Sequence, residues 1–325
     1  MIGEIFAMFA VLTFVGSNVL FRKVEHTASP TYINLFRTAF GTLTFIIVAL
    51  IIGSFFDIFL LPFELWIILF VSFLFGQVIG DTAYFNAQKE LGTTLALALS
   101  MTFPLFTFIL SLIFLNRPFE LNMIISLVLI GVGITIIGRY KIKAEENSLS
   151  SEERLHLSLK EQVRKALSTT SFKAIIFGFI ASLGWAVGLV IIDHATNQIN
   201  QILQTEGVSS IIANVIRFPF ALLILTLMVW RENISYNNIN HPTIHKKSLK
   251  TWSILLGASI IGTSIGAFLY TEAARTAGAN VMSLLASASP LFSLPLTYLI
   301  NKEKISKEGF IGVILTVIGV VVILL

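Results

Sequence analysis

The sequence predicts an all-α membrane protein with ten transmembrane helices, arranged as two five-helix repeats of opposite orientation. Hydrophobic residues make up 55% of the 325 residues and charged residues only 12%, whereas soluble proteins carry about 25% charged residues. The mean hydropathy is +0.87. A spanning helix needs about 20 mostly apolar residues. Ten stretches approximately meet this need: residues 2–21, 31–52, 63–88, 92–115, 119–138, 172–193, 207–230, 251–275, 279–299 and 305–325.

The composition excludes several classes of protein. The formal net charge is +4, but Lys and Arg lie between the apolar stretches, as membrane topology requires. No basic face therefore remains to follow a phosphate backbone, and we expect a lipid bilayer rather than nucleic acid as the partner. The chain has no Cys, which excludes thiolate metal sites. We expect no cofactor and no metal site, because the five histidines fall in predicted inter-helix loops: His26, His156, His194, His241 and His245.

A long segment of the chain is repeated. Residues Gly76–Phe106 recur without a gap 186 positions later, at Gly262–Phe292. Three glycines, a tyrosine and a proline are kept in register: Gly76, Gly80, Tyr84, Gly92 and Pro104 match Gly262, Gly266, Tyr270, Gly278 and Pro290. The match extends to other predicted spans: Asn34, Arg37 and Phe40 correspond to Asn214, Arg217 and Phe220, and Gly16 to Gly184. We interpret residues 1–138 and 172–325 as two copies of one unit, joined by a polar linker at 139–171.

Each predicted unit has an odd number of spans, so the second must enter the membrane upside down, as in the inverted repeats of many secondary transporters. The charges agree with this arrangement. Alternate segments between the predicted spans lie on the same side of the membrane. Of the 22 Lys and Arg, 18 fall on one side, and the other four are Arg37, Arg117, Arg217 and Arg275. By the positive-inside rule, the basic loops are cytoplasmic and both termini lie outside.

The linker 139–171 contains a capping box, Ser150-x-x-Glu153. Leu155 and Leu159 follow at helical spacing, with Lys160 beside them. This pattern predicts a short amphipathic helix on an anionic membrane surface. A solvated helical linker fits the same pattern.

Each half also contains a helix that begins at a proline, ends in a short polar turn and precedes a glycine-bearing helix. The second half reads Pro290 to Glu303 followed by Gly312 and Gly319; the first reads Pro104 to Arg117 followed by Gly131 and Gly133. In this motif the chain resembles the drug/metabolite transporter superfamily, specifically its EamA-type ten-helix members. Arg117 stands where that family usually has Glu. The resemblance covers all but the linker.

The resemblance implies a basket of two inverted five-helix repeats around a central cavity, with the fifth and tenth helices at the periphery. Members of the family are usually drawn with both termini in the cytoplasm. The distribution of basic residues indicates the opposite, so the sequence leaves the orientation open.

Asp81 is the sharpest candidate for a functional residue. It lies inside the predicted span 63–88, on the same helix face as Gln77, Tyr84 and Gln88. An ionisable group within a membrane is costly unless it is paired, so it usually faces a cavity or a partner. Asp81 could bind a substrate amine or a proton; alternatively, it forms a structural ion pair or lies near the interface. Its counterpart in the second copy is Ala267.

Arg37 and Arg217 are a repeated pair of cations inside predicted spans. They could hold a substrate carboxylate or pair with an acidic residue; Arg37 is also close enough to the helix end to snorkel. Possible acidic partners are Asp81, Asp193 and Glu272. The remaining candidate substrate contacts, for which simple packing is the alternative, are Asn34, Gln77, Tyr84, Trp185, Asn214, Tyr270, Ser283 and Ser287.

Glycines and prolines predict the packing of the repeated segment. Gly76-x-x-x-Gly80 and Gly262-x-x-x-Gly266 are small-xxx-small patterns, which let helix backbones approach closely in lipid. Such contacts are static packing or, in a transporter, surfaces that rock. Pro104 interrupts its helix and allows a kink, as does its counterpart Pro290.

These features favour a secondary transporter, not an enzyme, that exports a small polar metabolite (amino-acid-like or of another drug or metabolite class) by alternating access. No nucleotide-binding loop is present in the sequence, so transport would be coupled to H+ or to a counter-substrate. The alternatives are an intramembrane enzyme, or a channel or sensor built on a duplicated helical scaffold. We expect an integral, multi-pass protein of the bacterial plasma membrane.

Overall fold

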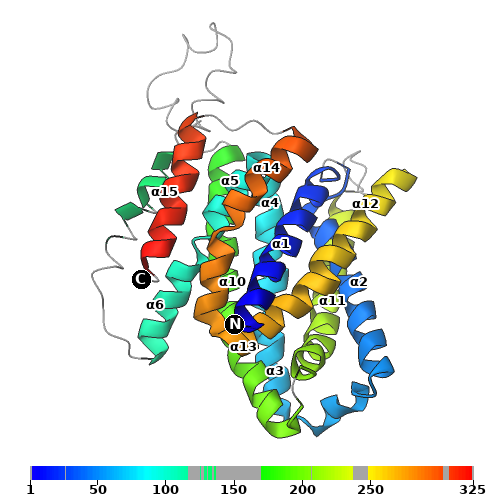
Figure 1. The fold of residues 1–325 in the computed structure, drawn as a ribbon. Helices are drawn as coiled ribbons and strands as arrows, with labels where there is room; N and C mark the ends of the chain where they lie inside the picture. Colours follow the sequence, from blue (N-terminus) through cyan, green and yellow to red (C-terminus); the bar gives the residue numbers. More distant parts are fainter. Residues whose placement is uncertain are drawn as a thin grey trace, which may run out of the picture.

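The computed structural model describes residues 2–25, 27–115, 170–205, 207–236, 248–302 and 307–323, together with residues 125, 128–129, 131–133 and 135–136. Every regular element among these residues is a helix (Figure 1). In the first half these are α1 (Ile2–Arg22), α2 (Pro30–Ile51), η1 (Phe55–Leu60), α3 (Phe63–Phe73), η2 (Leu74–Asp81), α4 (Thr82–Leu91), α5 (Thr93–Ser100) and α6 (Phe103–Leu115). In the second half they are α10 (Thr170–Leu203), α11 (Ser209–Tyr236), α12 (Leu249–Ser259), η3 (Ile260–Ile265), α13 (Gly266–Ser287), α14 (Ser289–Asn301) and α15 (Lys307–Ile323).

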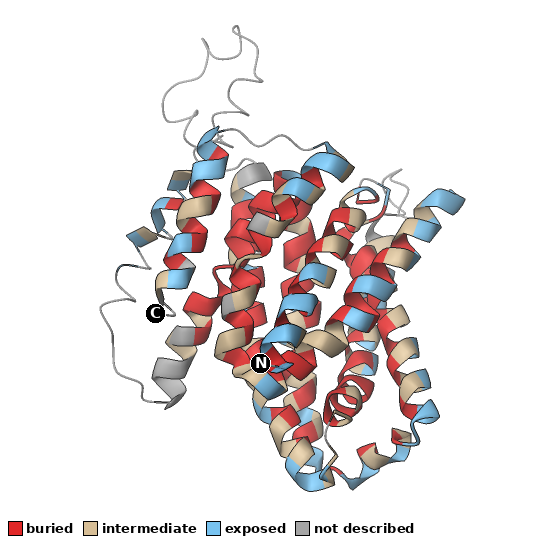
Figure 2. Cartoon of the chain, in the orientation of Figure 1, coloured by how far each residue is buried: buried red, intermediate tan, exposed pale blue. Residues whose placement is uncertain are grey.

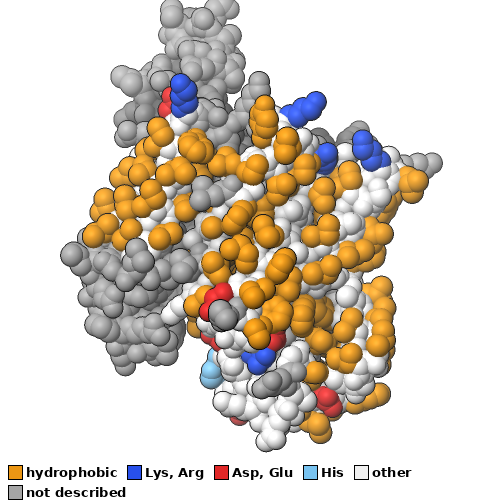
Figure 3. Space-filling view, in the orientation of Figure 1, with side chains coloured by type: hydrophobic (Ala, Val, Ile, Leu, Met, Phe, Trp, Pro, Cys, Tyr) orange, Lys and Arg blue, Asp and Glu red, His pale blue; other side chains and the backbone are white. Residues whose placement is uncertain are grey.

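Six helical runs within the described residues are long and apolar enough to cross a membrane: Ile2–Arg22, Pro30–Ile51, Phe63–Leu91, Phe172–Leu203, Ser209–Ile234 and Leu249–Ser283. The visible outer surface is covered with hydrophobic side chains (Figure 3). Exposed hydrophobic residues of the bundle include Leu43, Leu223 and Ile51. Buried residues are concentrated inside the bundle (Figure 2), and polar residues such as Asp81 are among the buried ones. This distribution suits lipid, where polar groups are stable only when they face the interior of the protein.

Most of the visible Lys and Arg side chains gather at one end of the bundle, at the upper edge of Figure 3. α1 ends there with Arg22, and the short polar turn after α14 carries Lys302. We call this the basic end.

Apart from 119–138, the predicted spans correspond to helices, with three main differences. The span 92–115 is two helices, α5 and α6, separated by Met101 and Thr102. The segment 279–299 is interrupted at Ala288, between α13 and α14. The predicted fifth span, 119–138, and the linker with its predicted amphipathic helix fall almost entirely outside the described residues.

The third difference concerns α10, which is longer than predicted. It continues past Asp193 to Leu203, so the assignment of His194 to a loop is wrong. The added turns are more polar than residues 172–193, so the sequence pattern did not include them, yet they contain no Gly or Pro to end the helix. Ala195 and Ile199 are fully buried on one face, which holds these turns against the bundle.

The two matching stretches adopt the same local structure. Each has a π-helical segment, η2 or η3, followed by α-helix. Each then turns at a glycine with positive φ, Gly92 at 81° and Gly278 at 85°, a conformation that side chains with a Cβ disfavour. Pro104 and Pro290 are the second residues of α6 and α14, immediately after the helix interruptions. Pro is tolerated at this position because its missing N–H has no partner there in any helix.

Glycines bring η2 and α10 into direct backbone contact. A Cβ added to Gly184 would lie 2.6 Å from the Phe75 carbonyl oxygen and 3.2 Å from Gly80 Cα, and one added to Gly188 would lie 3.0 Å from Gly76 Cα. Two small-xxx-small pairs thus face each other, the close-packing arrangement expected of helices in lipid. Ser72 Oγ donates a hydrogen bond to the Gly188 carbonyl oxygen, 2.9 Å away, at the same contact.

The second π-helical segment makes the matching contact with α1. A Cβ on Gly262 would clash with Ser17, and one on Gly266 would lie 2.9 Å from Thr13 Oγ1. Thr13, rather than Gly16, therefore occupies the place that Gly184 occupies in α10. Gly16 has no atom within 4 Å of a Cβ position, so the contacts do not support its predicted match with Gly184.

We predict that Gly184→Ala destabilises the protein by about 1–3 kcal/mol, because the added methyl group overpacks a backbone contact. Gly16→Ala on α1 is the matched control and should be neutral or stabilising by about 0.5–1 kcal/mol, since it only improves helix propensity. Thermal unfolding of the two purified variants in detergent measures both changes. Equal stability of the two would contradict the close contact at Gly184.

Candidate functional site

A cavity lies at the centre of the bundle, between α1, η2, α10, α11 and the η3–α13 run. Water-sized spheres can occupy about 110 Å³ of it, which is room for several water molecules or one small solute. Its walls combine charged, aromatic and small residues from both halves: Ala10, Val11, Phe14, Arg37, Ser72, Phe73, Gly76, Gln77, Asp81, Met101, Phe103, Trp185, Gly188, Leu189, Arg217, Gly262, Gly266, Ala267, Tyr270, Met282, Ala286 and Ser289.

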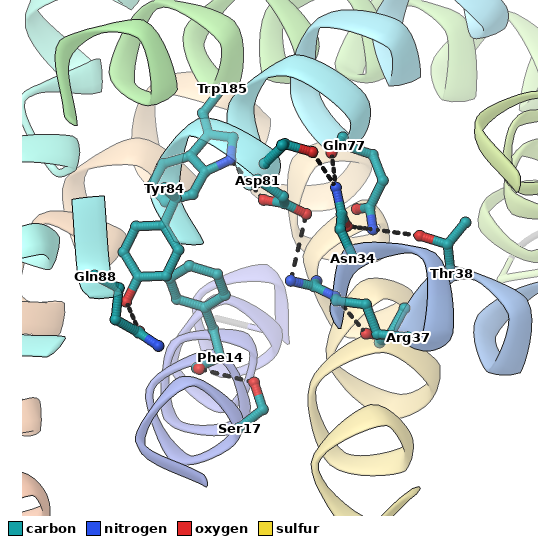
Figure 4. Close-up of polar contacts among 12 residues, drawn as sticks. Phe14, Ser17, Asn34, Arg37, Thr38, Gln77, Asp81, Tyr84, Gln88 and Trp185 are labelled. Atoms are coloured by element: carbon teal, nitrogen blue, oxygen red, sulfur yellow. Dashed lines mark hydrogen bonds and ion pairs between the residues drawn. The ribbon is translucent and has the colours of Figure 1, made fainter. Parts of the chain in front are cut away.

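Asp81, at the end of η2, is paired on both oxygens (Figure 4). Its Oδ1 accepts a hydrogen bond from Trp185 Nε1 at 2.8 Å, and its Oδ2 lies 3.4 Å from Arg37 Nη1. Arg37 Nε donates in turn to Thr263 Oγ1 at 2.8 Å. All four side chains are buried. Their pairing offsets the cost of removing two charges from water, and it links α2, α10 and both π-helical segments.

Amide side chains connect α2 to η2 just beside this ion pair. Asn34 Nδ2 donates to the Gln77 carbonyl oxygen at 2.7 Å and to Thr82 Oγ1 at 2.9 Å. Gln77 Nε2 donates to Asn34 Oδ1 at 3.1 Å and to Thr38 Oγ1 at 2.9 Å (Figure 4). The π-helical segment departs from the regular i→i+4 pattern, and Asn34 provides a partner for one of its carbonyl groups.

An aromatic cluster forms one wall of the cavity. The Trp185 ring contacts Phe14 edge-on with centroids 5.5 Å apart, Tyr84 at 5.3 Å and Phe103 at 6.3 Å. Tyr84 is fully buried behind Trp185, and its hydroxyl donates to Gln88 Oε1 at 2.6 Å. Trp185 therefore both faces the cavity and fixes the Asp81 carboxylate.

Arg217, on α11, has different surroundings from Arg37. Its guanidinium carbon lies 4.2 Å from the centroid of the Phe73 ring, a cation–π distance. The side chain is buried, yet Nε and Nη1 have no hydrogen-bond partner. Arg217 is also close enough to Asp81 and Tyr270 to interact with them electrostatically.

Six of the predicted substrate contacts line the cavity: Arg37, Gln77, Asp81, Trp185, Arg217 and Tyr270. Of the predicted packing glycines, Gly76, Gly262 and Gly266 line it as well, while Gly80 packs against Trp185. Five predicted contacts lie outside the cavity: Asn34, Tyr84, Asn214, Ser283 and Ser287. Asn34 and Tyr84 support lining residues from behind, and Asn214 Oδ1 accepts a hydrogen bond from Thr271 at 3.3 Å. Pro104 and Pro290 do not reach the cavity.

Ser283 and Ser287 do not line this cavity. Met282, Ala286 and Ser289 face the cavity, whereas Ser283 bonds back to the Asn280 carbonyl oxygen at 2.8 Å. The residues that line the cavity, Met282 and Ala286, thus each lie one position before the predicted Ser283 and Ser287. The presence of a hydroxyl group did not identify the helix face that lines the cavity.

Sequence reasoning missed mainly apolar lining residues, such as Phe14, Phe73 and Phe103. A phenylalanine on an apolar span carries no signal that separates a cavity wall from a lipid-facing surface. Ser72 could have been found, because it lies one turn before Gly76 on the face that meets α10. Gly188 could also have been found, since it completes a small-xxx-small pattern with Gly184.

The other acidic residues considered as partners of the arginines are engaged elsewhere. Asp193 Oδ2 accepts from the Ala279 N–H at 2.9 Å, just after the turn at Gly278. Glu272 accepts from Ser210 Oγ at 2.6 Å and pairs with Arg275. No group of three or more His, Asp or Glu side chains that could hold a metal ion occurs among the described residues.

The model of the EamA-like transporter family matches residues 1–139 and 172–325. The chain belongs to this family. It is therefore an integral, multi-pass membrane protein of the drug/metabolite transporter superfamily, as its sequence motif indicated.

Two further similarities extend over the whole length of this EamA-like protein. An uncharacterized transporter of Archaeoglobus fulgidus is 22% identical over 327 residues, covering 100% of this chain and 99% of that protein. A crystal structure of another protein superposes with a TM-score of 0.60 at 14% identity, covering 99% of this chain and 96% of that one. The latter similarity concerns the fold alone.

We predict that Asp81→Asn lowers stability by about 3–5 kcal/mol, because Arg37 would keep a buried charge without its partner. The double variant with Arg37→Gln should lose clearly less than the two single variants combined, since it removes both charges. Denaturant unfolding in detergent measures this cycle, with Glu64→Gln, an exposed carboxylate on α3, as the control. Additive losses would show that the two charges do not interact.

Proposed function

We propose that this EamA-like protein is a secondary transporter that carries a small polar metabolite by alternating access of the central cavity. One observation carries the proposal: a cavity in the middle of a membrane bundle is lined by charged side chains from both halves. Charged groups at this depth are rare and mark substrate or ion pathways. Transporters bind their substrates near the midplane, between repeats.

The matching contacts of the two halves support the proposed motion. Residues 1–138 and 172–325 are proposed as inverted repeats, because each contains a π-helical segment, a glycine turn and a small-residue contact with the first helix of the other half. We propose that the halves rock about these two contacts. Glycine contacts suit such motion, since they contain few interlocking side chains.

A buried hydrogen-bonded chain lies between the cavity and the basic end. Tyr84 bonds to Gln88, Gln88 Nε2 donates to Glu25 Oε2 at 3.3 Å, and Glu25 pairs with Arg22. Arg22 Nη1 also donates to the carbonyl oxygens of Gln88 and Lys89, each at 2.8 Å. We propose that this series of hydrogen-bonded side chains closes the cavity toward the basic end. We also propose that the basic end is cytoplasmic, in accord with the positive-inside rule. Both termini would then lie outside.

The coupling follows from the same residues. Among the described residues of the cavity wall, Asp81 is the acidic one. Its protonation would release Arg37 and Trp185 and loosen three elements together. We propose coupling to H+ or exchange against a second solute, with export across a bacterial plasma membrane as the direction.

The proposal predicts saturable counterflow. Vesicles containing the purified protein are loaded in turn with labelled amino acids, nucleosides, sugars and organic cations. We expect at least one class to exchange, and Asp81→Asn to reduce the exchange by tenfold or more while Glu64→Gln leaves it unchanged. Conductance without saturation, or conversion of a solute to a product, would contradict a carrier.

The cavity should also be open to water during transport. Because the chain has no Cys, a single Cys can be introduced without further changes. Ala286→Cys, in the cavity wall, should react with a membrane-impermeant maleimide. Ala49→Cys, fully buried on α2 away from the cavity, should not. Equal protection of both positions would show that the cavity never opens.

A further inference from the structure

The two equivalent arginines differ in their partners. Arg37 donates to Thr263 through Nε, and its Nη1, which makes no hydrogen bond, forms an ion pair with Asp81. Arg217 is 94% buried, and neither its Nε nor its Nη1 has a hydrogen-bond partner. In the repeat register, the position of Asp81 is taken by Ala267, which lines the same cavity. The carboxylate that pairs with the first arginine is thus missing beside the second.

The charges of the cavity show the same deficit. Among the residues that the structure describes, the ionisable groups in the cavity wall are Arg37, Asp81, Arg217 and Tyr270. Two guanidinium groups face one carboxylate, which leaves one positive charge uncompensated. An unpaired charge in an interior of low polarity is strongly unfavourable, so a bound anion would relieve it.

We propose that Arg217 binds a singly negative group of the transported solute, most simply a carboxylate, in the place where Asp81 stands beside Arg37. This inference rests on the transport function proposed above. Phe73 covers one face of the Arg217 guanidinium. The edge of the guanidinium can bind a carboxylate through two parallel hydrogen bonds. Tyr270, one turn after Ala267, offers a hydroxyl from the same wall. The small apolar residues Ala10 and Val11 leave room for a compact, uncharged remainder.

The substitution Ala267→Asp tests this assignment. By the register of the repeat, it would place an internal carboxylate toward Arg217, as Asp81 is placed toward Arg37. It should therefore displace the solute anion without removing the arginine. The protein is purified in a neutral detergent free of anionic lipid. Thermal shifts are then measured with pairs that differ by one charge: acetate and acetamide, lactate and lactamide, and N-acetylglycine and its amide.

We expect at least one carboxylate, but not its amide, to raise the melting temperature of the unaltered protein. Ala267→Asp and Arg217→Gln should each weaken this binding by about 30-fold or more, and Arg217→Lys, which keeps the charge, by less. Arg231→Gln, on the exposed end of the same helix, is the matched control and should bind normally. Because Ala267→Asp pairs a free charge, its melting temperature without ligand should not fall.

Equal shifts with carboxylates and amides, or full binding by Ala267→Asp and Arg217→Gln, would overturn the assignment. Full binding together with lost counterflow in Arg217→Gln would instead make Arg217 an alternate partner of Asp81. A shift produced by vesicles of anionic lipid, but by no soluble carboxylate, would assign the site to a lipid headgroup. Counterflow of an uncharged solute that Ala267→Asp leaves unchanged would refute this inference but not the transport function.

Discussion

The close approach of helix backbones at two small-residue contacts is the constraint on which this structure depends. Lipid provides no hydrophobic force between helices, so they associate through packing and polar contacts. Gly184 and Gly188 allow α10 to touch η2, while Gly262 and Gly266 allow the η3–α13 run to touch α1. These contacts place Trp185 and Phe14 edge to face across the centre of the bundle, and the cavity lies between the two packed pairs.

The polar groups inside the bundle are arranged around this scaffold. Asp81 joins Trp185 on α10 to Arg37 on α2, and Arg37 reaches Thr263 in the other half. A hydrogen bond between Thr44 and Ser264, 2.8 Å long, adds a second link between α2 and the other half. In a medium without water, such groups must find partners within the protein. Arg217 differs from Arg37 because the repeat counterpart of Asp81 is an alanine, Ala267.

The candidate site was partly accessible from the sequence. Asp81 and the repeated arginines Arg37 and Arg217 could be predicted as site residues, because a charged side chain inside an apolar span has a high free-energy cost in a membrane. All three line the cavity. Tyr84 was expected there by the same helical spacing. It is fully buried instead, because its ring packs against Trp185 and its hydroxyl bonds to Gln88.

By itself, the sequence determined the helical membrane class, the repeated segment and the residues too costly to expose to lipid, since composition and periodicity depend only on local order along the chain. The tertiary structure decided which arginine meets Asp81, that Ser283 turns away from the cavity, and that Thr13 stands opposite Gly266. These outcomes depend on how helices distant in sequence are rotated against one another. Backbone packing sets that rotation, and a linear pattern of residues does not contain it.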